Sequence, residues 1–167
     1  MSLLTRETEL KNTKPIVVGG SAVDFYTNGV FQSYDIDLVG DRKIIGDILE
    51  NTFGFKRSGR HWIDEEIGIF VEVSGDSLAG SKDKITTMTV EGLKLYIIGI
   101  EDLIIDRLAA CQEWKSDTDC KQAHYLLRYY QSRIDFEYLT KKAKQEGLST
   151  VLKNSCLASL EVTPVHN

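Results

Sequence analysis

Hydrophobic and polar positions follow two different periods along the chain, and the change falls near residue 99. Before it, short apolar runs alternate with polar positions and are separated by glycine-containing turns, as in strands joined by tight connections. After it, apolar residues recur at steps of three and four, as on one face of a helix. The pattern predicts an α/β (α+β) core over residues 1–99 and a C-terminal helical segment over residues 100–167, packed on that core.

Apolar spacing and turn residues also predict the individual elements. The expected strands of the core are 15–18, 33–39, 67–73, 85–90 and 93–98, with a hairpin over 55–63, and its expected helices are 2–12, 22–26 and 43–52. Later helices are expected to begin near residues 100, 117, 135 and 151, with either Ser116 or Asp117 capping the second. The last residues, 161–167, are expected to be a frayed tail.

The first candidate for chemistry is the turn Gly19-Gly20-Ser21, which follows the apolar run 15–18 and opens a helix. The first amides of a helix have no partner within the helix, and the positive end of its dipole lies there. Such a turn therefore offers free N–H groups to a phosphate.

The second candidate is the pair Asp35 and Asp37 in the alternating run 33–39. Residues two apart in a strand point to the same face, so the two carboxylates project together. They repel each other unless a cation lies between them, and Mg²⁺ takes such ligands while leaving room for substrate phosphates. Two ordinary acids on an exposed strand are the alternative, but the glycine turn is then unexplained.

A third acid, Glu72, lies between valines in the run 67–73, whose apolar residues begin at Ile67 and share the opposite face. An acid in an apolar strand is costly unless it is paired, bound to a ligand or at an edge. We predict that Glu72 is a third metal ligand or a general base, and that the three carboxylates face one cavity. The rival acids, which are Asp64, Glu65, Glu66 and Asp76, lie in turn-like sequence.

These motifs together resemble the signature of the minimal nucleotidyltransferases of the DNA polymerase β-like superfamily, which include the AbiEii-like toxin proteins. The resemblance covers residues 14–73 and, loosely, the later helices. It implies a nucleotidyltransferase-fold mixed sheet with flanking helices. It also implies that Gly19, Gly20 and Ser21 hold a triphosphate and that the acid pair binds Mg²⁺ or Mn²⁺.

Two further positions are compared with that family. Ser33 keeps the hydroxyl of the family's Arg-x-Ser/Thr-x-Asp run, but Phe31 replaces its Arg, which leaves open a weakened enzyme. Arg107 lies on the helix from which a basic residue of the family reaches the nucleotide phosphates. It could equally pair with Asp102 or Asp106 on its own helix.

The resemblance implies a metal-dependent transfer of a nucleoside monophosphate from an NTP to a hydroxyl acceptor, with release of pyrophosphate. The acceptor could be a protein, a tRNA or a small molecule. A toxin–antitoxin role with a cognate protein partner is also implied. The alternative is a catalytically inactive nucleotide-binding or partner-binding module on the same fold.

Composition narrows the setting. A net charge of −5 argues against a protein that coats nucleic acid by bulk electrostatics, and 42% hydrophobic residues can form a core. No apolar run is long enough for a membrane span, and the isolated histidines argue against a zinc site. The number of cysteines is odd, they lack the spacing of metal ligands, and the sequence shows no signal peptide, which together indicate a reducing cytoplasm for Cys111, Cys120 and Cys156. Cys111 lies on the apolar face of a helix and is expected to be a core residue.

Overall fold

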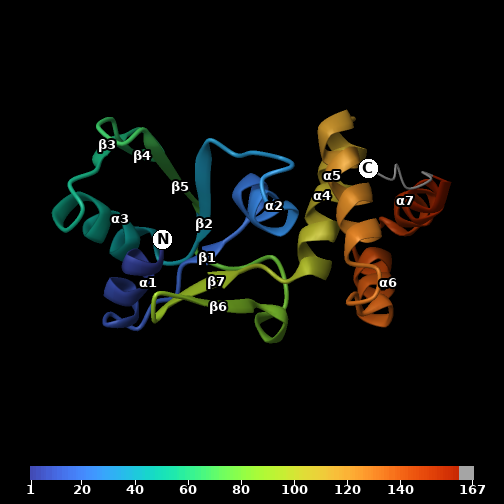
Figure 1. Cartoon of the computed structure of the whole chain (residues 1–167), viewed down its shortest axis with the longest axis horizontal. Helices are drawn as coiled ribbons and strands as arrows, with labels where there is room; N and C mark the ends of the chain where they lie inside the picture. The colour runs from blue at the N-terminus through green and yellow to red at the C-terminus, as the bar shows by residue number, and fades with distance from the viewer. Residues whose placement is uncertain (162–167) are drawn as a thin grey trace. The chain divides into compact units, whose positions relative to one another are not determined.

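The computed structural model describes residues 1–161 and separates the chain into two compact units (Figure 1). The first unit spans Met1–Gly99 and the second begins at Ile100. Most of the predicted frayed tail, from residue 162, lies outside the described residues.

The first unit contains a seven-stranded mixed sheet with the order β3-β4-β5-β2-β1-β7-β6. Its strands are β1 (Ile16–Val17), β2 (Asp35–Val39), β3 (Lys56–Ser58), β4 (His61–Asp64), β5 (Ile69–Gly75), β6 (Thr86–Val90) and β7 (Leu93–Ile97). Strand β2 lies inside the sheet, antiparallel to β1 and parallel to β5, and its Leu38 is fully buried. The mixed α/β class predicted from the sequence is confirmed.

Three helices accompany this sheet: α1 (Ser2–Glu9), α2 (Gly19–Thr27) and α3 (Arg42–Asn51), with a 3₁₀ turn, η1 (Lys82–Lys84). Helix α1 packs against β7 and α3, whereas α2 packs against β2 (Figure 1). Asp41 caps α3 by accepting a hydrogen bond from the Ile44 amide at 2.9 Å. Helix α3 covers the sheet face that carries Trp62, because a Cβ added at Gly46 would lie 2.5 Å from the Trp62 ring.

Several predicted boundaries in the first unit are wrong: α1 ends at Glu9 rather than at residue 12, β2 begins at Asp35 rather than at residue 33, and two further differences lie near the candidate site. Helix α2 begins at Gly19 rather than at Ala22, so the glycines form its first turn instead of preceding it. Strand β5 begins at Ile69, and Ile67 is 62% exposed rather than part of the apolar face. The reason is a turn in which the Asp64 carboxylate accepts hydrogen bonds from the amides of Glu66 and Ile67.

The second unit is helical in the part that the structure describes, with α4 (Ile100–Trp114), α5 (Asp117–Tyr129), α6 (Phe136–Gln145) and α7 (Ser149–Glu161). Ser116 is the residue that caps α5, since its hydroxyl accepts from the Asp119 amide. Asp102 is 1% exposed and accepts a hydrogen bond from the Tyr138 hydroxyl at 2.7 Å, which joins α4 to α6. No helix within residues 1–161 has the length and apolar character needed to cross a lipid bilayer.

Candidate active site

Strand register brings the three predicted acids onto one face of the sheet. Asp37 lies opposite Glu72 in the parallel pair of β2 and β5, and Asp35 lies opposite Phe70. Paired residues on neighbouring strands, about 4.8 Å apart, project to the same face, as do residues two apart in one strand. Asp35, Asp37 and Glu72 therefore share the face opposite to Trp62, which pairs with Val71.

The first turn of α2 lies directly against Asp37. The Gly20 amide donates to Asp37 Oδ2 at 3.0 Å. Gly19 has a φ of +58°, and a Cβ built there would come within 2.6 Å of the same oxygen. Both the backbone conformation and the close approach require glycine at position 19. The sequence predicts free amides at this turn, but the Gly20 amide is already bonded to a carboxylate.

Two hydroxyl groups fix the backbone around the acid pair. Ser21 Oγ donates to the Val18 carbonyl and accepts from the Asp37 amide, both at 3.0 Å, which ties the start of α2 to β2. Ser33 Oγ is within hydrogen-bond distance of the Asp35 carbonyl at 3.0 Å and of its carboxylate Oδ1 at 3.2 Å. Both serines lie beside the acids, and phosphate binding by Gly19, Gly20, Ser21 and Ser33 stays a prediction.

The electrostatics of Asp37 reflect this crowding. Burial raises the pKa of its carboxyl group, and the negative charge of Asp35 raises it further. Hydrogen bonds from the amides of Gly20 and Ser21 lower that pKa, and Glu72 adds a smaller upward contribution. The net result is a carboxylate whose charge is disfavoured without a cation nearby.

Glu72 is held by two basic residues, Arg60 in the turn before β4 and His61 at the first position of β4. Its Oε2 is 3.1 Å from His61 Nε2, its Oε1 is 3.3 Å from Arg60 Nε, and its side chain is only 16% exposed. Sequence reasoning missed both partners. The turn at Ser58-Gly59 was predicted, but the pairing of His61 with Glu72 depends on the register between β4 and β5, which no local pattern specifies.

The donor set fits a divalent ion only in part. Among the residues that the structure describes, no group of three or more His, Cys, Asp or Glu side chains is arranged to hold a metal. Asp35 and Asp37 alone still present hard oxygen ligands on one face, and Mg²⁺ in nucleotide sites is commonly bound by one or two carboxylates plus phosphates. The two aspartates therefore fit such an ion, whereas Glu72 as a ligand stays a prediction.

Arg107 lies in the second unit and is engaged there. Its Nη1 donates to Asp119 at 2.7 Å, and its Nε and Nη2 donate to Asp106. Of the two acids that the sequence offered as partners, Asp106 is the one used, and Asp102 bonds Tyr138 instead. A phosphate role for Arg107 stays a prediction.

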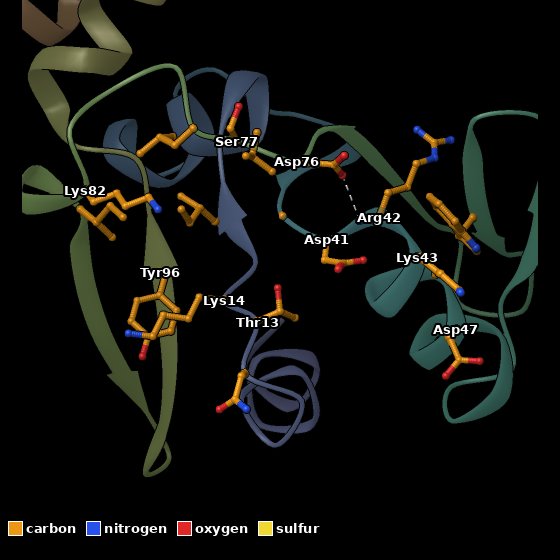
Figure 2. Close-up of a pocket in the computed structure, with 18 of the residues that line it drawn as sticks. Thr13, Lys14, Asp41, Arg42, Lys43, Asp47, Asp76, Ser77, Lys82 and Tyr96 are labelled. Carbon is orange, nitrogen blue, oxygen red and sulfur yellow. Dashed lines mark hydrogen bonds between the residues drawn. The ribbon is translucent and has the colours of Figure 1, made fainter.

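A cavity of about 1150 Å³ lies elsewhere in the first unit (Figure 2). Lys14 beside Tyr96 lines one side and Arg42 with Lys43 lines another, whereas Asp35, Asp37 and Glu72 are not among its lining residues. This cavity is therefore not the one that the three acids are predicted to face.

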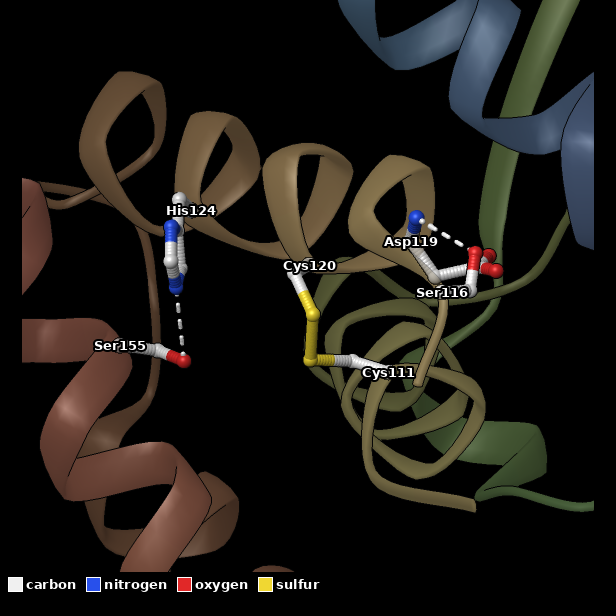
Figure 3. Close-up of a disulfide and its surroundings, with 6 residues drawn as sticks. All are labelled: Cys111, Ser116, Asp119, Cys120, His124 and Ser155. Carbon is white, nitrogen blue, oxygen red and sulfur yellow. Dashed lines mark hydrogen bonds between the residues drawn. A yellow bond between two sulfur atoms is a disulfide. The ribbon is translucent and has the colours of Figure 1, made fainter. Parts of the chain in front are cut away.

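The cysteines correct another prediction. Cys111 on α4 and Cys120 on α5 form a disulfide, with Cα atoms 4.8 Å apart (Figure 3). Cys111 is therefore half of a cross-link between two helices and not an isolated core residue, and Cys156 takes no part in this bridge. The sequence missed the bridge because it depends on how the α4–α5 hairpin closes.

Comparison with known proteins supports the fold. No protein-family model matches the sequence, and no curated protein does. An antigenic nucleotidyltransferase-like protein from Paracoccidioides brasiliensis superposes with a TM-score of 0.58 at 16% identity, covering 94% of this chain and 90% of that one.

The antibiotic-resistance factor ANT(2'')-Ia is similar in two structures. Its crystal structure with adenylyl-2''-tobramycin gives a TM-score of 0.57 at 15% identity, covering 86% of this chain and 94% of that one. Its solution structure gives 0.52 at 15% identity, with 95% and 91% covered. At these identities the likeness establishes the nucleotidyltransferase fold and nothing finer.

Proposed function

We propose that the chain is a metal-dependent nucleotidyltransferase, which moves a nucleoside monophosphate from an NTP to a hydroxyl acceptor. The observation that carries the proposal is the acid pair of β2 at the N-terminus of α2, with the Asp37 carboxylate 3.0 Å from the Gly20 amide. On the nucleotidyltransferase fold, this arrangement joins a cation site to an anion site.

Asp35 and Asp37 would hold Mg²⁺ or Mn²⁺. When bound, the ion neutralises charge on the phosphates and activates the acceptor oxygen. The charge of Asp35 raises the pKa of Asp37, so a cation at this position relieves a repulsion that the free protein contains. A cation bound at Asp37 would compete with the Gly20 amide for Oδ2, and that amide would then be available to a phosphate.

In the transfer, the acceptor oxygen forms a bond to the α-phosphorus of the NTP. The bond between the α-phosphorus and the oxygen that bridges it to the β-phosphorus breaks, and pyrophosphate leaves. The acceptor hydroxyl loses its proton, and Glu72 on the same face as Asp37 would take it. Each carboxylate oxygen has two lone pairs, so Glu72 keeps acceptor capacity beside its bonds to Arg60 and His61.

A label-transfer assay tests the proposal. The protein is incubated with each α-³²P-labelled NTP, Mg²⁺ or Mn²⁺, and a cell extract that supplies acceptors. We expect one NTP to label a macromolecule or small molecule, and Asp37→Asn to abolish the labelling. Asp47→Asn is the matched control, because Asp47 is an exposed acid of α3 that bonds Lys11 and Asn51.

A second candidate, a nucleotide-binding module without turnover, is favoured by one observation. The Gly20 amide and both Glu72 oxygens are engaged within the protein. Metal-dependent binding of a non-hydrolysable NTP analogue, with no labelling from any NTP, would favour this module over the enzyme.

A further inference from the structure

The residues that hold Glu72 come from one end of a single hairpin. Arg60 lies in the turn between β3 and β4, and His61 is the first residue of β4. One contacts Oε1 of Glu72 and the other contacts Oε2, so both carboxylate oxygens are oriented at once. Contact on both oxygens restricts rotation of the carboxylate about its last torsion.

Strand register explains why these contacts form beside the acid pair. Ser58, His61, Glu72 and Asp37 form one continuous row across β3, β4, β5 and β2. Side chains in such a row project to the same face. His61 therefore flanks Glu72 on the side opposite to Asp37.

The hairpin is itself fastened to the strand that carries Glu72. Arg42 Nη1 donates to the Val73 carbonyl at 2.7 Å, and its Nη2 donates to the Arg60 carbonyl at 3.0 Å. The Arg42 guanidinium also lies 5.0 Å from the centre of the Trp62 ring. These contacts fix the backbone of Arg60 relative to β5, so its side chain approaches Glu72 from a defined position.

The charges of the neighbouring residues explain why Glu72 needs these two contacts. Glu72 lies directly opposite Asp37 in the register of β2 and β5, so the two negatively charged carboxylates repel each other. A guanidinium on the far side of Glu72 offsets that repulsion, and the imidazole supplies a directed hydrogen bond. The two contacts therefore hold the Glu72 carboxylate in place against that repulsion.

We propose that His61 and Arg60 are positioning residues, which hold the Glu72 carboxylate beside Asp37 in the orientation that accepts the acceptor's proton. The inference rests on the proposed transfer reaction and adds residues that act only through Glu72. Loss of the side chains that orient metal-binding residues typically lowers metal affinity or activity by roughly 10- to 100-fold, and we expect a loss of the same size for Glu72.

The test separates the rate of transfer from nucleotide binding. The labelling rate at saturating NTP, the KM for NTP and the Kd of a non-hydrolysable analogue are measured for His61→Ala and Arg60→Met. We expect the maximal rate to fall roughly 10- to 100-fold while KM and Kd change less than about twofold. His61→Gln should recover much of the rate, because its amide N–H can donate to Glu72 as the imidazole does.

Arg57→Met is the matched control. Arg57 belongs to the same hairpin but lies beside the Trp62 ring on the opposite face, 5.8 Å from the ring centre. We expect its loss to leave the transfer rate unchanged. A Glu72→Gln background adds a second check, since replacing His61 there should cause no further loss if His61 acts through Glu72.

Three results would overturn the assignment: an unchanged rate in His61→Ala and Arg60→Met, an equal loss in Arg57→Met, or a His61→Gln variant no better than His61→Ala. A wild-type protein that labels no acceptor with any NTP would remove the proposed function itself. That failure is seen before any variant is compared, so the two failures are distinguishable.

Discussion

Replacement of Gly19 by alanine perturbs the contact between the α2 turn and the acid pair most directly. Gly19 has a φ of +58°, and a Cβ there would lie 2.6 Å from Oδ2, 3.1 Å from Cγ and 3.2 Å from Cβ of Asp37. All three Asp37 atoms would be too close to the new Cβ at position 19, so the Asp37 carboxylate must turn away from it. Turning it breaks the 3.0 Å hydrogen bond from the Gly20 amide.

The expected loss of unfolding free energy in Gly19→Ala has two parts. A left-handed backbone costs a residue with a Cβ roughly 1–2 kcal/mol. Loss of a hydrogen bond to a charged group costs about 1.5–3 kcal/mol more, so Gly19→Ala should lower the free energy of unfolding by roughly 2.5–5 kcal/mol. Gly68→Ala is the matched control, because Gly68 has a φ of +69° with nothing within 4 Å of its Cβ position. Gly68→Ala should show only the backbone cost of roughly 1–2 kcal/mol.

Urea unfolding followed by tryptophan fluorescence measures both variants. The chain has two tryptophans, of which Trp62 is 2% exposed in the first unit and Trp114 is 77% exposed in the second. In a Trp114→Phe background the signal reports the first unit alone. Equal losses of unfolding free energy in Gly19→Ala and Gly68→Ala would refute the placement of the Asp37 carboxylate against the α2 turn.

Three further outcomes are expected. The pKa of Asp37 is raised above its ordinary value of 3.8, so the charge of Asp37 destabilises the metal-free fold once the pH rises above that value. Asp37→Asn should therefore raise Tm at pH 7. In a series of thermal melts at different pH, this gain in Tm should disappear below pH 3.8. Reduction of the Cys111–Cys120 disulfide, whose partners are nine positions apart, should lower the free energy of unfolding in urea by about 2–3 kcal/mol, and a Cys111→Ser, Cys120→Ser protein should not respond to reductant. Tyr138→Phe should cost about 1–3 kcal/mol in urea unfolding, because it removes a hydrogen bond to the buried carboxylate of Asp102.

Strand periodicity was sufficient to predict that Asp35 and Asp37 share a face and that Glu72 projects away from the apolar side of its own strand. The alternation of Asp35 and Asp37 with apolar neighbours is a local property, and the same holds for Glu72 between Val71 and Val73. Each of these strands is bounded by turn residues that the sequence shows directly. The order of strands followed by helices could therefore be predicted from local pattern, whereas the mixed sheet was expected only from the family resemblance.

Features that depend on contacts between distant segments could not be predicted in this way. The pairing of His61 with Glu72 needs the β4–β5 register, and the engagement of the Gly20 amide needs the approach of α2 to β2. The Cys111–Cys120 bridge needs the closure of two helices. In each case the side chain's partner is chosen by packing, so composition and spacing carry no signal for it.

On the proposed function, the acid pair of β2 and the first turn of α2 form one site for a metal–NTP complex. Calorimetric titration of non-hydrolysable NTP analogues, with and without Mg²⁺, tests it most directly. We predict that the wild-type protein binds an analogue only with Mg²⁺, that Asp37→Asn weakens binding at least about tenfold, or roughly 1.4 kcal/mol, and that Asp47→Asn binds as the wild type does. If the wild type binds no analogue, or if Asp37→Asn binds as tightly as the wild type, these residues do not form a metal–NTP site.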